Sequence, residues 1–284
     1  MYSFRIVMAQ WSRHLALAVC LLVNFNLSAP ATAAEKDLAS PKDIQSILAR
    51  GTIRVAITKF DLPAFHWRDG SGEWAGPEID LGRLVGRSMR VGVEFIDDCP
   101  TFDAVIDAVA SGRADIGISK LSQTSLRLVR VRFSDPYLTM RQAFLFDRIF
   151  VGAEAAGRPF EDALRKFGGT IGVIAKSAYV DHAQRNFPEA QLSELQTWED
   201  AVEALLNGRV KALYRDEFEV RRVLKKDPTL NVRFGSAGLS DMKALLSIAI
   251  CDTCTRLQEF VNFQIAENRV PFVLSRMLAT EAIK

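Results

Sequence analysis

One sequence pattern occurs twice in the chain, and this internal repeat limits the possible folds more than any other feature. The first copy runs from Phe102 to Ile116 and the second from Trp198 to Ala212. Each copy has an aromatic residue, a segment with helical spacing, a glycine and a short strand-like segment. Two units of this kind predict a pair of similar α/β lobes, since a solenoid needs more and shorter units. Chance recurrence of a common helix–strand unit is the alternative.

Strand-like and helix-like segments alternate along the rest of the chain. Thr52 to Ile57 and Thr170 to Ile174 are rich in β-branched residues, and each precedes one copy of the repeat. Ile79 to Met89 carries apolar residues at helical spacing, and residues 91–95 alternate as in a half-buried strand. This order predicts an α/β protein with mainly parallel sheets.

Composition and charge exclude several classes of protein. Hydrophobic residues make up 49% of the 284 residues and charged residues 25%, which is ordinary for a globular protein and unlike a disordered or multi-spanning membrane chain. The formal net charge is only +2, whereas a domain that wraps nucleic acid has a larger positive excess. We therefore expect no nucleic-acid partner.

Residues 1–33 have the layout of a secretory signal peptide. Arg5 and Arg13 supply positive charge, Leu15 to Val23 is an unbroken apolar run, and Ala31 to Ala33 is a cleavage site of small residues. The apolar run is too short to span a bilayer, which takes about 20 residues. An N-terminal anchor helix is the alternative. Cleavage leaves equal numbers of basic and acidic residues, and it predicts a periplasmic or secreted protein.

The cysteines fit an exported protein. Cys251 and Cys254 are separated by two residues, a spacing that suits a redox dithiol, half of a zinc site or a local disulfide. A zinc site needs two more ligands, and the mature chain offers only Cys99, His66 and His182. In an oxidising compartment a small structural disulfide is the preferred interpretation.

The usual catalytic signatures are missing. The chain has no nucleophile elbow, no phosphate-binding loop, no zinc-protease motif and no dinucleotide fingerprint. His66 lies between two aromatic residues and is expected in a loop or the core, whereas His182 lies among polar residues and is expected to be solvated. We expect no catalytic residue, no cofactor and no metal.

A hydroxyl-rich stretch from Ile118 to Arg127 follows a predicted strand. Thr124 or Ser125 is placed to cap a helical turn, which would bring Arg127 close to free backbone N–H groups. Exposed N–H groups, hydroxyls and a guanidinium together form a site for a carboxylate, because arginine donates two parallel hydrogen bonds to a planar anion. A solvated loop with an ordinary surface arginine is the alternative.

Several short segments carry a resemblance to a known family. In chain order they are residues 51–56, 63–65, 76–81, 102–106, 112–116, 119–127, 133–137, 172–177, 208–217 and 257–262. In their order and spacing the chain resembles the family 3 extracellular solute-binding proteins, the amino-acid-binding components of bacterial ABC importers.

The resemblance implies a two-lobed, periplasmic-binding-protein-like (type II) α/β fold. Each lobe would be a mainly parallel sheet flanked by helices, and a two-strand hinge would join the lobes. Lobe 1 would be discontinuous, formed by residues 42–140 and 245–284, and lobe 2 would be formed by residues 141–244.

The resemblance also assigns ligand-binding residues. Arg127 matches the arginine that pairs with the ligand α-carboxylate, and Ser122 matches the residue that donates a hydroxyl and an N–H to the same group. Ser177 matches a second carboxylate donor, Asp216 the acid that takes the α-ammonium, and Phe102 an aromatic residue that packs on the ligand. These partners suit the two opposite charges of an amino acid.

Some positions depart from the family pattern. Leu62 stands where many relatives have an aromatic residue, Lys59 near where they have an acid, and Lys120 where they have a small residue. Ser119, Lys120 and Leu62 complete the candidate ligand-binding set. If Lys59 or Lys120 faces the cleft, an anionic side group such as that of a dicarboxylate is favoured; the alternative is that both lysines point to solvent.

These features predict a monomeric binding protein that captures an amino acid or related small carboxylate and delivers it to an ABC-type membrane permease. Two other functions stay open. One is an enzyme on the same scaffold, similar to cyclohexadienyl dehydratases, because fold alone does not separate binding from catalysis. The other is an accessory or sensor protein without a role in transport.

Overall fold

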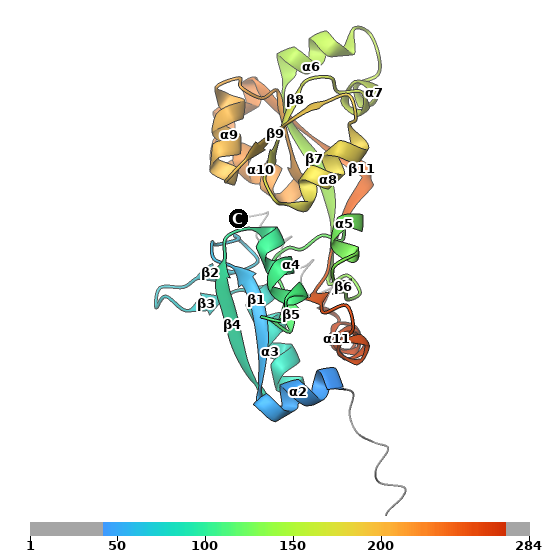
Figure 1. Ribbon diagram of the computed structural model, residues 1–284. Coiled ribbons are helices and arrows are strands. Elements are labelled where there is room, and N and C mark those ends of the chain that lie inside the picture. Colours follow the sequence, from blue (N-terminus) through green and yellow to red (C-terminus); the bar gives the residue numbers. More distant parts are fainter. Residues whose placement is uncertain (1–41, 271–284) are drawn as a thin grey trace, which may run out of the picture. The chain divides into compact units, whose positions relative to one another are not determined.

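The structure is a computed structural model, and it describes residues 42–270 (Figure 1). The predicted signal peptide and the last part of the predicted lobe 1 lie outside the described residues. Within them, no helix is long and apolar enough to cross a membrane.

The first lobe is built on a five-stranded sheet with the strand order β4-β1-β5-β12-β6. Its strands are β1 (Thr52–Thr58), β4 (Gly92–Cys99), β5 (Ile116–Gly117), β6 (Arg132–Phe133) and β12 (Ala249–Ile250). Its helices are α2 (Lys42–Arg50), α3 (Pro77–Met89), α4 (Phe102–Ala110), α5 (Ser125–Leu128) and α11 (Thr255–Glu267). A small hairpin is formed by β2 (Trp67–Arg68) and β3 (Trp74–Ala75).

The second lobe is built on a five-stranded sheet with the order β11-β7-β10-β8-β9. Its strands are β7 (Leu138–Asp147), β8 (Thr170–Ile174), β9 (Gln191–Leu195), β10 (Ala212–Asp216) and β11 (Phe234–Leu246). Its helices are α6 (Arg148–Ala155), α7 (Phe160–Arg165), α8 (Ala178–Asn186), α9 (Trp198–Leu206), α10 (Glu217–Lys226) and the 3₁₀ helix η1 (Pro228–Val232). The expected two-lobed α/β fold is confirmed.

The sequence repeat corresponds to equivalent helices in the two lobes. Thr101 caps α4 and Thr197 caps α9, and each hydroxyl accepts the N–H of the third helical residue. After each helix a glycine adopts the left-handed conformation, with φ of 74° at Gly112 and 73° at Gly208. A side chain is disfavoured there, which explains why both copies have glycine.

Both sheets are mixed, and this differs from the mainly parallel sheets expected from the sequence. β1 runs parallel to β4 and β5, and β8 runs parallel to β9 and β10. In contrast, β12 is antiparallel to β5 and β6, and β7 is antiparallel to β10 and β11. The antiparallel pairs come from segments in which the chain leaves one lobe and returns. β6 and β12 have two residues each, which is too short to give a recognisable alternation.

The two long strands β7 and β11 lie side by side (Figure 1) and connect the lobes. They pair antiparallel from Leu138 opposite Leu246 to Asp147 opposite Phe234, with a register shift between Leu239 and Lys243. This irregularity interrupts the ladder close to residue 244, where the sequence predicts that lobe 2 ends.

The topology also indicates where a ligand would bind. In each lobe the chain passes from a middle strand to one neighbour and then to the other, giving the orders β4-β1-β5 and β9-β8-β10. In α/β sheets ligands bind outside the carboxyl ends of the strands at such a switch point. The residues that follow β1, β5, β8 and β10 are therefore expected to line a ligand-binding site.

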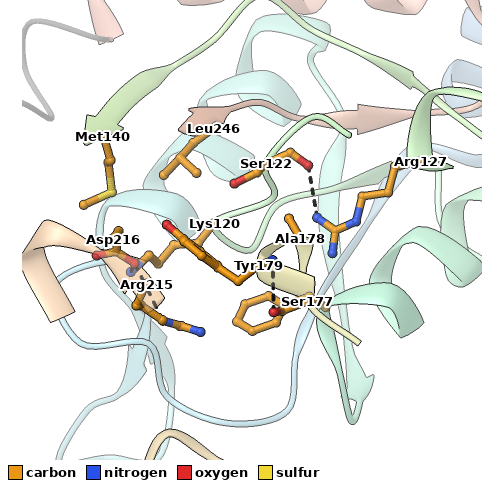
Figure 2. A pocket seen from close by; sticks show the side chains of 11 residues that line it. Lys120, Ser122, Arg127, Met140, Ser177, Ala178, Tyr179, Arg215, Asp216 and Leu246 are labelled. Atoms are coloured by element: carbon orange, nitrogen blue, oxygen red, sulfur yellow. Dashed lines mark hydrogen bonds and ion pairs between the residues drawn. The ribbon is translucent and has the colours of Figure 1, made fainter. Parts of the chain in front are cut away.

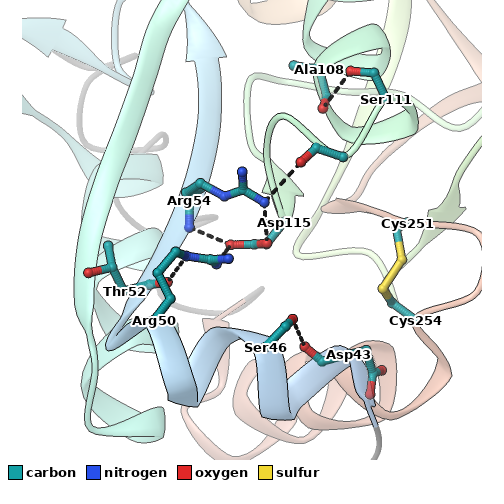
Figure 3. A network of polar contacts seen from close by, with 11 residues as sticks. Asp43, Ser46, Arg50, Thr52, Arg54, Ala108, Ser111, Asp115, Cys251 and Cys254 are labelled. Carbon is teal, nitrogen blue, oxygen red and sulfur yellow. Dashed lines mark hydrogen bonds and ion pairs between the residues drawn. A yellow bond between two sulfur atoms is a disulfide. The ribbon is translucent and has the colours of Figure 1, made fainter.

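Cys251 and Cys254 form a disulfide just before α11 (Figure 3), as the preferred interpretation expects. Cys99 is free and fully buried. Residues 42–270 contain no cluster of three or more residues able to hold a metal ion. Figure 3 also shows Asp115 accepting from the Arg54 N–H at 2.7 Å and pairing with the Arg50 side chain, which ties β1 to the loop before β5.

Candidate functional site

A pocket lies at the carboxyl ends of strands from both lobes (Figure 2). It is lined by Phe102, Lys120, Ser122, Arg127, Met140, Ser177, Ala178, Tyr179, Arg215, Asp216 and Leu246. All the residues predicted to bind ligand are in this set except Ser119 and Leu62. The pocket therefore brings together side chains that lie almost 100 positions apart, such as Lys120 and Asp216.

Arg127 is positioned by a short helix. Thr124 is the N-cap of α5, as one of the two expected caps, and its hydroxyl accepts the Arg127 N–H at 3.3 Å. The guanidinium Nε and Nη2 donate to Asp103 Oδ1 at 3.1 and 2.8 Å, and Nη1 donates to the Ser122 carbonyl at 3.1 Å. The alternative of an ordinary surface arginine is wrong, because Arg127 is only 4% exposed.

Arg127 keeps part of its hydrogen-bonding capacity. A guanidinium has five N–H groups, and with three of them engaged, one on Nη1 and one on Nη2 have no acceptor in the described part of the chain. Burial lowers the pKa of the Arg127 guanidinium, while Asp103 acts in the opposite direction. Two open N–H groups on a buried cation match the two oxygens of a carboxylate.

Ser122 and Ala178 provide further hydrogen-bond donors in the pocket. Ser122 follows β5, and its Oγ and N–H form no hydrogen bond with residues 42–270; only its carbonyl is engaged, by Arg127. Ala178 is the first residue of α8, so its N–H has no acceptor inside the helix. A helix N-terminus favours an anion.

Ser177, which the resemblance implies as a second carboxylate donor, is the N-cap of α8. Its Oγ donates to the Ile174 carbonyl at 2.6 Å and accepts from the Tyr179 N–H at 3.3 Å. The hydroxyl proton is therefore engaged within the protein. Ser177 contributes to the pocket by fixing the start of the helix.

Lys120 and Asp216 form a buried ion pair across the pocket. Lys120 Nζ lies 3.0 Å from Asp216 Oδ2 and 3.3 Å from Glu219 Oε1, and all three side chains are 3–4% exposed. The ammonium also lies 4.5 Å from the centre of the Phe65 ring. Burial by itself would raise the pKa of the Asp216 carboxyl, but Lys120 and Arg215 lower it below the ordinary value.

The two lysines singled out in the sequence have different surroundings. Lys120 faces the pocket and is held in a left-handed conformation with φ of 46°, where its N–H donates to Glu78 Oε1 at 2.6 Å. Lys59 is exposed. The alternative that both lysines point to solvent is therefore wrong for Lys120.

Arg215 is a pocket residue that the sequence did not indicate. It is 4% exposed, and its guanidinium carbon lies 5.5 Å from the Phe102 ring centre, 5.8 Å from Tyr179 and 5.5 Å from Trp198. Its guanidinium makes no hydrogen bond to residues 42–270, and Nε lies 3.7 Å from Asp216 Oδ2. The only sequence feature that could have indicated Arg215 as a pocket residue is its position next to Asp216.

Ser119 and Leu62 do not line the pocket, so their predicted contact with ligand is not supported. Ser119 Oγ accepts the Thr58 N–H at 2.9 Å and holds the end of β1. Leu62 is 4% exposed and pairs with His66 through a backbone bridge. Both residues support the loops beside the site from within the core.

A buried polar network lies beneath the Lys120 loop. His66 Nδ1 lies 2.8 Å from Glu78 Oε2 and its Nε2 lies 3.0 Å from Thr58 Oγ1, and His66 and Glu78 are fully buried. Burial, and the neighbouring Glu78, raise the pKa of the Tyr137 hydroxyl, which donates to Glu78 Oε1. Since no atom of this network reaches solvent, we assign it to positioning the loop, and His66 is a core residue as expected.

Part of the chain matches a family of known proteins. Residues 53–149 match the model of the bacterial extracellular solute-binding proteins, family 3. Over these residues the chain is similar to this family. The expectation drawn from the sequence is thereby confirmed.

Curated relatives of the chain include two binding proteins. An arginine-binding periplasmic protein of Mannheimia haemolytica is 25% identical over 54% of this chain, and the match spans 59% of its own length. The lysine/arginine/ornithine-binding periplasmic protein of Escherichia coli is 26% identical over 80% of this chain and 79% of its own length. Both relatives are named as binding proteins.

A solved structure has a similar fold. It is an ancestral amino acid-binding protein described as a precursor of cyclohexadienyl dehydratase, with a TM-score of 0.65 and 24% identity over 84% of this chain and 97% of the ancestral one. At this identity the likeness shows the fold alone.

His182 is buried, which corrects the expected solvated position. It lies on α8 with 3% exposure, on the same face as Tyr179 one turn earlier, whose ring centre is 5.7 Å away. This face packs towards β10, where the Tyr214 ring centre lies 5.4 Å from that of Tyr179. Its Nδ1 lies 3.1 Å from Arg185 Nη2, and Nε2 has no partner in residues 42–270. Burial, then Arg185 and Arg127, lower the pKa of His182 from 6.5 to about 4.

We expect the protein to lose stability as the pH falls from about 6.5 to 4 because of His182. The unfolded chain takes up the proton near pH 6.5 and the folded chain only near pH 4, so protonation favours unfolding. The expected loss is on the order of 2 kcal/mol. Urea unfolding of wild type and His182→Gln at pH 7.5 and 4.5 measures it: the variant should lose correspondingly less. Equal losses in both proteins would contradict the assignment.

Proposed function

We propose that this protein binds a small carboxylate outside the cytoplasmic membrane and delivers it to an ABC-type permease. The observation that supports this most is the buried Arg127 with one open N–H on each terminal nitrogen. The names of the relatives, which are periplasmic amino-acid-binding proteins, support the location and the class of ligand.

The proposed binding step uses groups from both lobes. Arg127 and Ser122 of the first lobe hold the carboxylate, and the N-terminus of α8 in the second lobe faces the same pocket. The lobes close on the ligand by bending of β7 and β11 near the register shift beyond Leu239. Closure removes water from the ion pairs and strengthens them.

Binding of a carboxylate should stabilise the protein against heat. At a concentration of 100 times the dissociation constant, a specific ligand adds about 2.7 kcal/mol to the free energy of unfolding, which a thermal-shift assay detects easily. The assay should use amino acids, monocarboxylates and dicarboxylates, with each positive result repeated by calorimetry. A complete absence of binding among these carboxylates would contradict the proposed function.

A further inference from the structure

The Asp216 carboxylate in the pocket is already paired with an ammonium of the protein itself, that of Lys120. Asp216 Oδ2 accepts a hydrogen bond from Lys120 Nζ at 3.0 Å, and Asp216 Oδ1 accepts one from the Glu219 N–H at 3.1 Å. The second carboxylate in reach of Lys120, that of Glu219, also lies 3.6 Å from Arg222 Nη1. Both carboxylates are therefore engaged by the protein, and a ligand ammonium would have to displace Lys120.

Displacement of Lys120 is unfavourable for two reasons. The Lys120 side chain is 4% exposed, so moving it from Asp216 and Glu219 would leave an ammonium without its partners in a partly dry site. A ligand ammonium placed beside it would then face a like charge at short range. Among the described residues that line the pocket, Asp216 alone carries a carboxylate, so the ligand ammonium has no second acid to use.

A second cation of the chain fills the aromatic part of the pocket. The Arg215 guanidinium lies among the rings of Phe102, Tyr179 and Trp198, where a cationic ligand group would otherwise stack. Its donors have no acceptor within residues 42–270, although the residue is only 4% exposed. A buried guanidinium without an acceptor is a site for an anionic or carbonyl oxygen.

The unmet hydrogen-bonding capacity of the pocket is therefore almost entirely that of donors. The groups that can only donate are the two open N–H groups of Arg127, the N–H groups of Ser122 and Ala178, and the Arg215 guanidinium. The Ser122 and Tyr179 hydroxyls, which can also accept, complete the set. Figure 2 shows Arg127 on one side of the pocket, with Arg215 and Asp216 on the opposite side.

We propose that the ligand is a small dicarboxylate without an ammonium group, with one carboxylate on Arg127 and Ser122 and the other on Arg215. Lys120 acts as an internal replacement for the ammonium of an amino acid. This inference rests on the proposed function and narrows its class of ligand.

The test compares molecules that differ only in the ammonium group. Succinate is paired with L-aspartate and glutarate with L-glutamate, and calorimetry measures their affinity for the wild-type protein, with L-arginine as a cationic comparison. The better dicarboxylate should bind at least 100-fold more tightly than its amino acid. Binding of aspartate, glutamate or arginine as tightly as either dicarboxylate would overturn the inference. If that binding is lost in Arg127→Ala, the proposed function still holds.

Lys120→Gly tests the role of the internal ammonium. Glycine suits the left-handed backbone at this position, and the change frees Asp216 for a ligand ammonium. The affinity ratio of dicarboxylate to amino acid should fall at least tenfold. The matched control is Arg90→Gly, an exposed cation with φ of 57° at the end of α3, which should leave the ratio unchanged. An unchanged ratio in Lys120→Gly would overturn the inference.

Arg215→Gln provides an independent variant in case Lys120→Gly does not fold. It should weaken the better dicarboxylate at least tenfold, while the monocarboxylate that lacks only the second carboxyl group, propionate for succinate or butyrate for glutarate, keeps its affinity. Equal effects on the two ligands would show that Arg215 does not bind the second carboxylate, and would overturn the inference.

Discussion

Asp216→Asn is expected to lower the free energy of unfolding by roughly 3 kcal/mol, because it removes one partner of a buried ion pair. Lys120 Nζ lies 3.0 Å from Asp216 and 3.3 Å from Glu219, so the variant leaves the ammonium with Glu219 alone. The value is at the lower end for such changes, since Glu219 still accepts a hydrogen bond. Asparagine also caps helices well, so the loss is not that of the N-cap of α10.

Denaturant unfolding of three variants checks this result. The matched control is Asp98→Asn, whose partner Arg113 is 44% exposed and whose own side chain is 69% exposed, so its loss should stay below about 1 kcal/mol. The double variant Asp216→Asn with Lys120→Met should recover much of the loss, because no buried charge remains without its partner. A loss below about 1 kcal/mol in Asp216→Asn alone would mean that the pair is solvated.

Local signals predicted the repeat and its elements well. The strand Thr170–Ile174 has the predicted limits, and each copy of the repeat contains the predicted helix followed by its glycine. The cap at Thr124 followed from the same local chemistry. Such features depend on residues that are neighbours in the chain, so one sequence suffices to find them.

Features that depend on distant residues were missed. His182 is buried because the face of α8 that it shares with Tyr179 packs towards Tyr214 on β10, and nothing in its polar neighbours indicates that packing. The antiparallel strands β6 and β12 have two residues each and carry no periodic signal. Neither the Lys120–Asp216 pair nor the aromatic surroundings of Arg215 can be recognised before the two lobes are placed together.

Arg127→Ala is expected to weaken carboxylate binding by about 3–4 kcal/mol, or roughly 100- to 1,000-fold, because the carboxylate then loses its charged partner in a buried site. Arg127→Lys should also bind poorly, since an ammonium cannot donate the two parallel hydrogen bonds of a guanidinium. Folding should be less affected, because the Asp103 side chain that Arg127 leaves behind is 39% exposed and can be solvated.

Calorimetric titration of wild type, Arg127→Ala and Arg113→Ala with the carboxylate that gives the largest thermal shift tests the central claim most directly. Arg113 is a suitable control because it is an exposed arginine of the first lobe, paired with Asp98 outside the pocket. The predicted result is a loss of at least 100-fold in Arg127→Ala and an unchanged affinity in Arg113→Ala. Equal affinities in all three proteins would contradict the claim that Arg127 holds the ligand carboxylate.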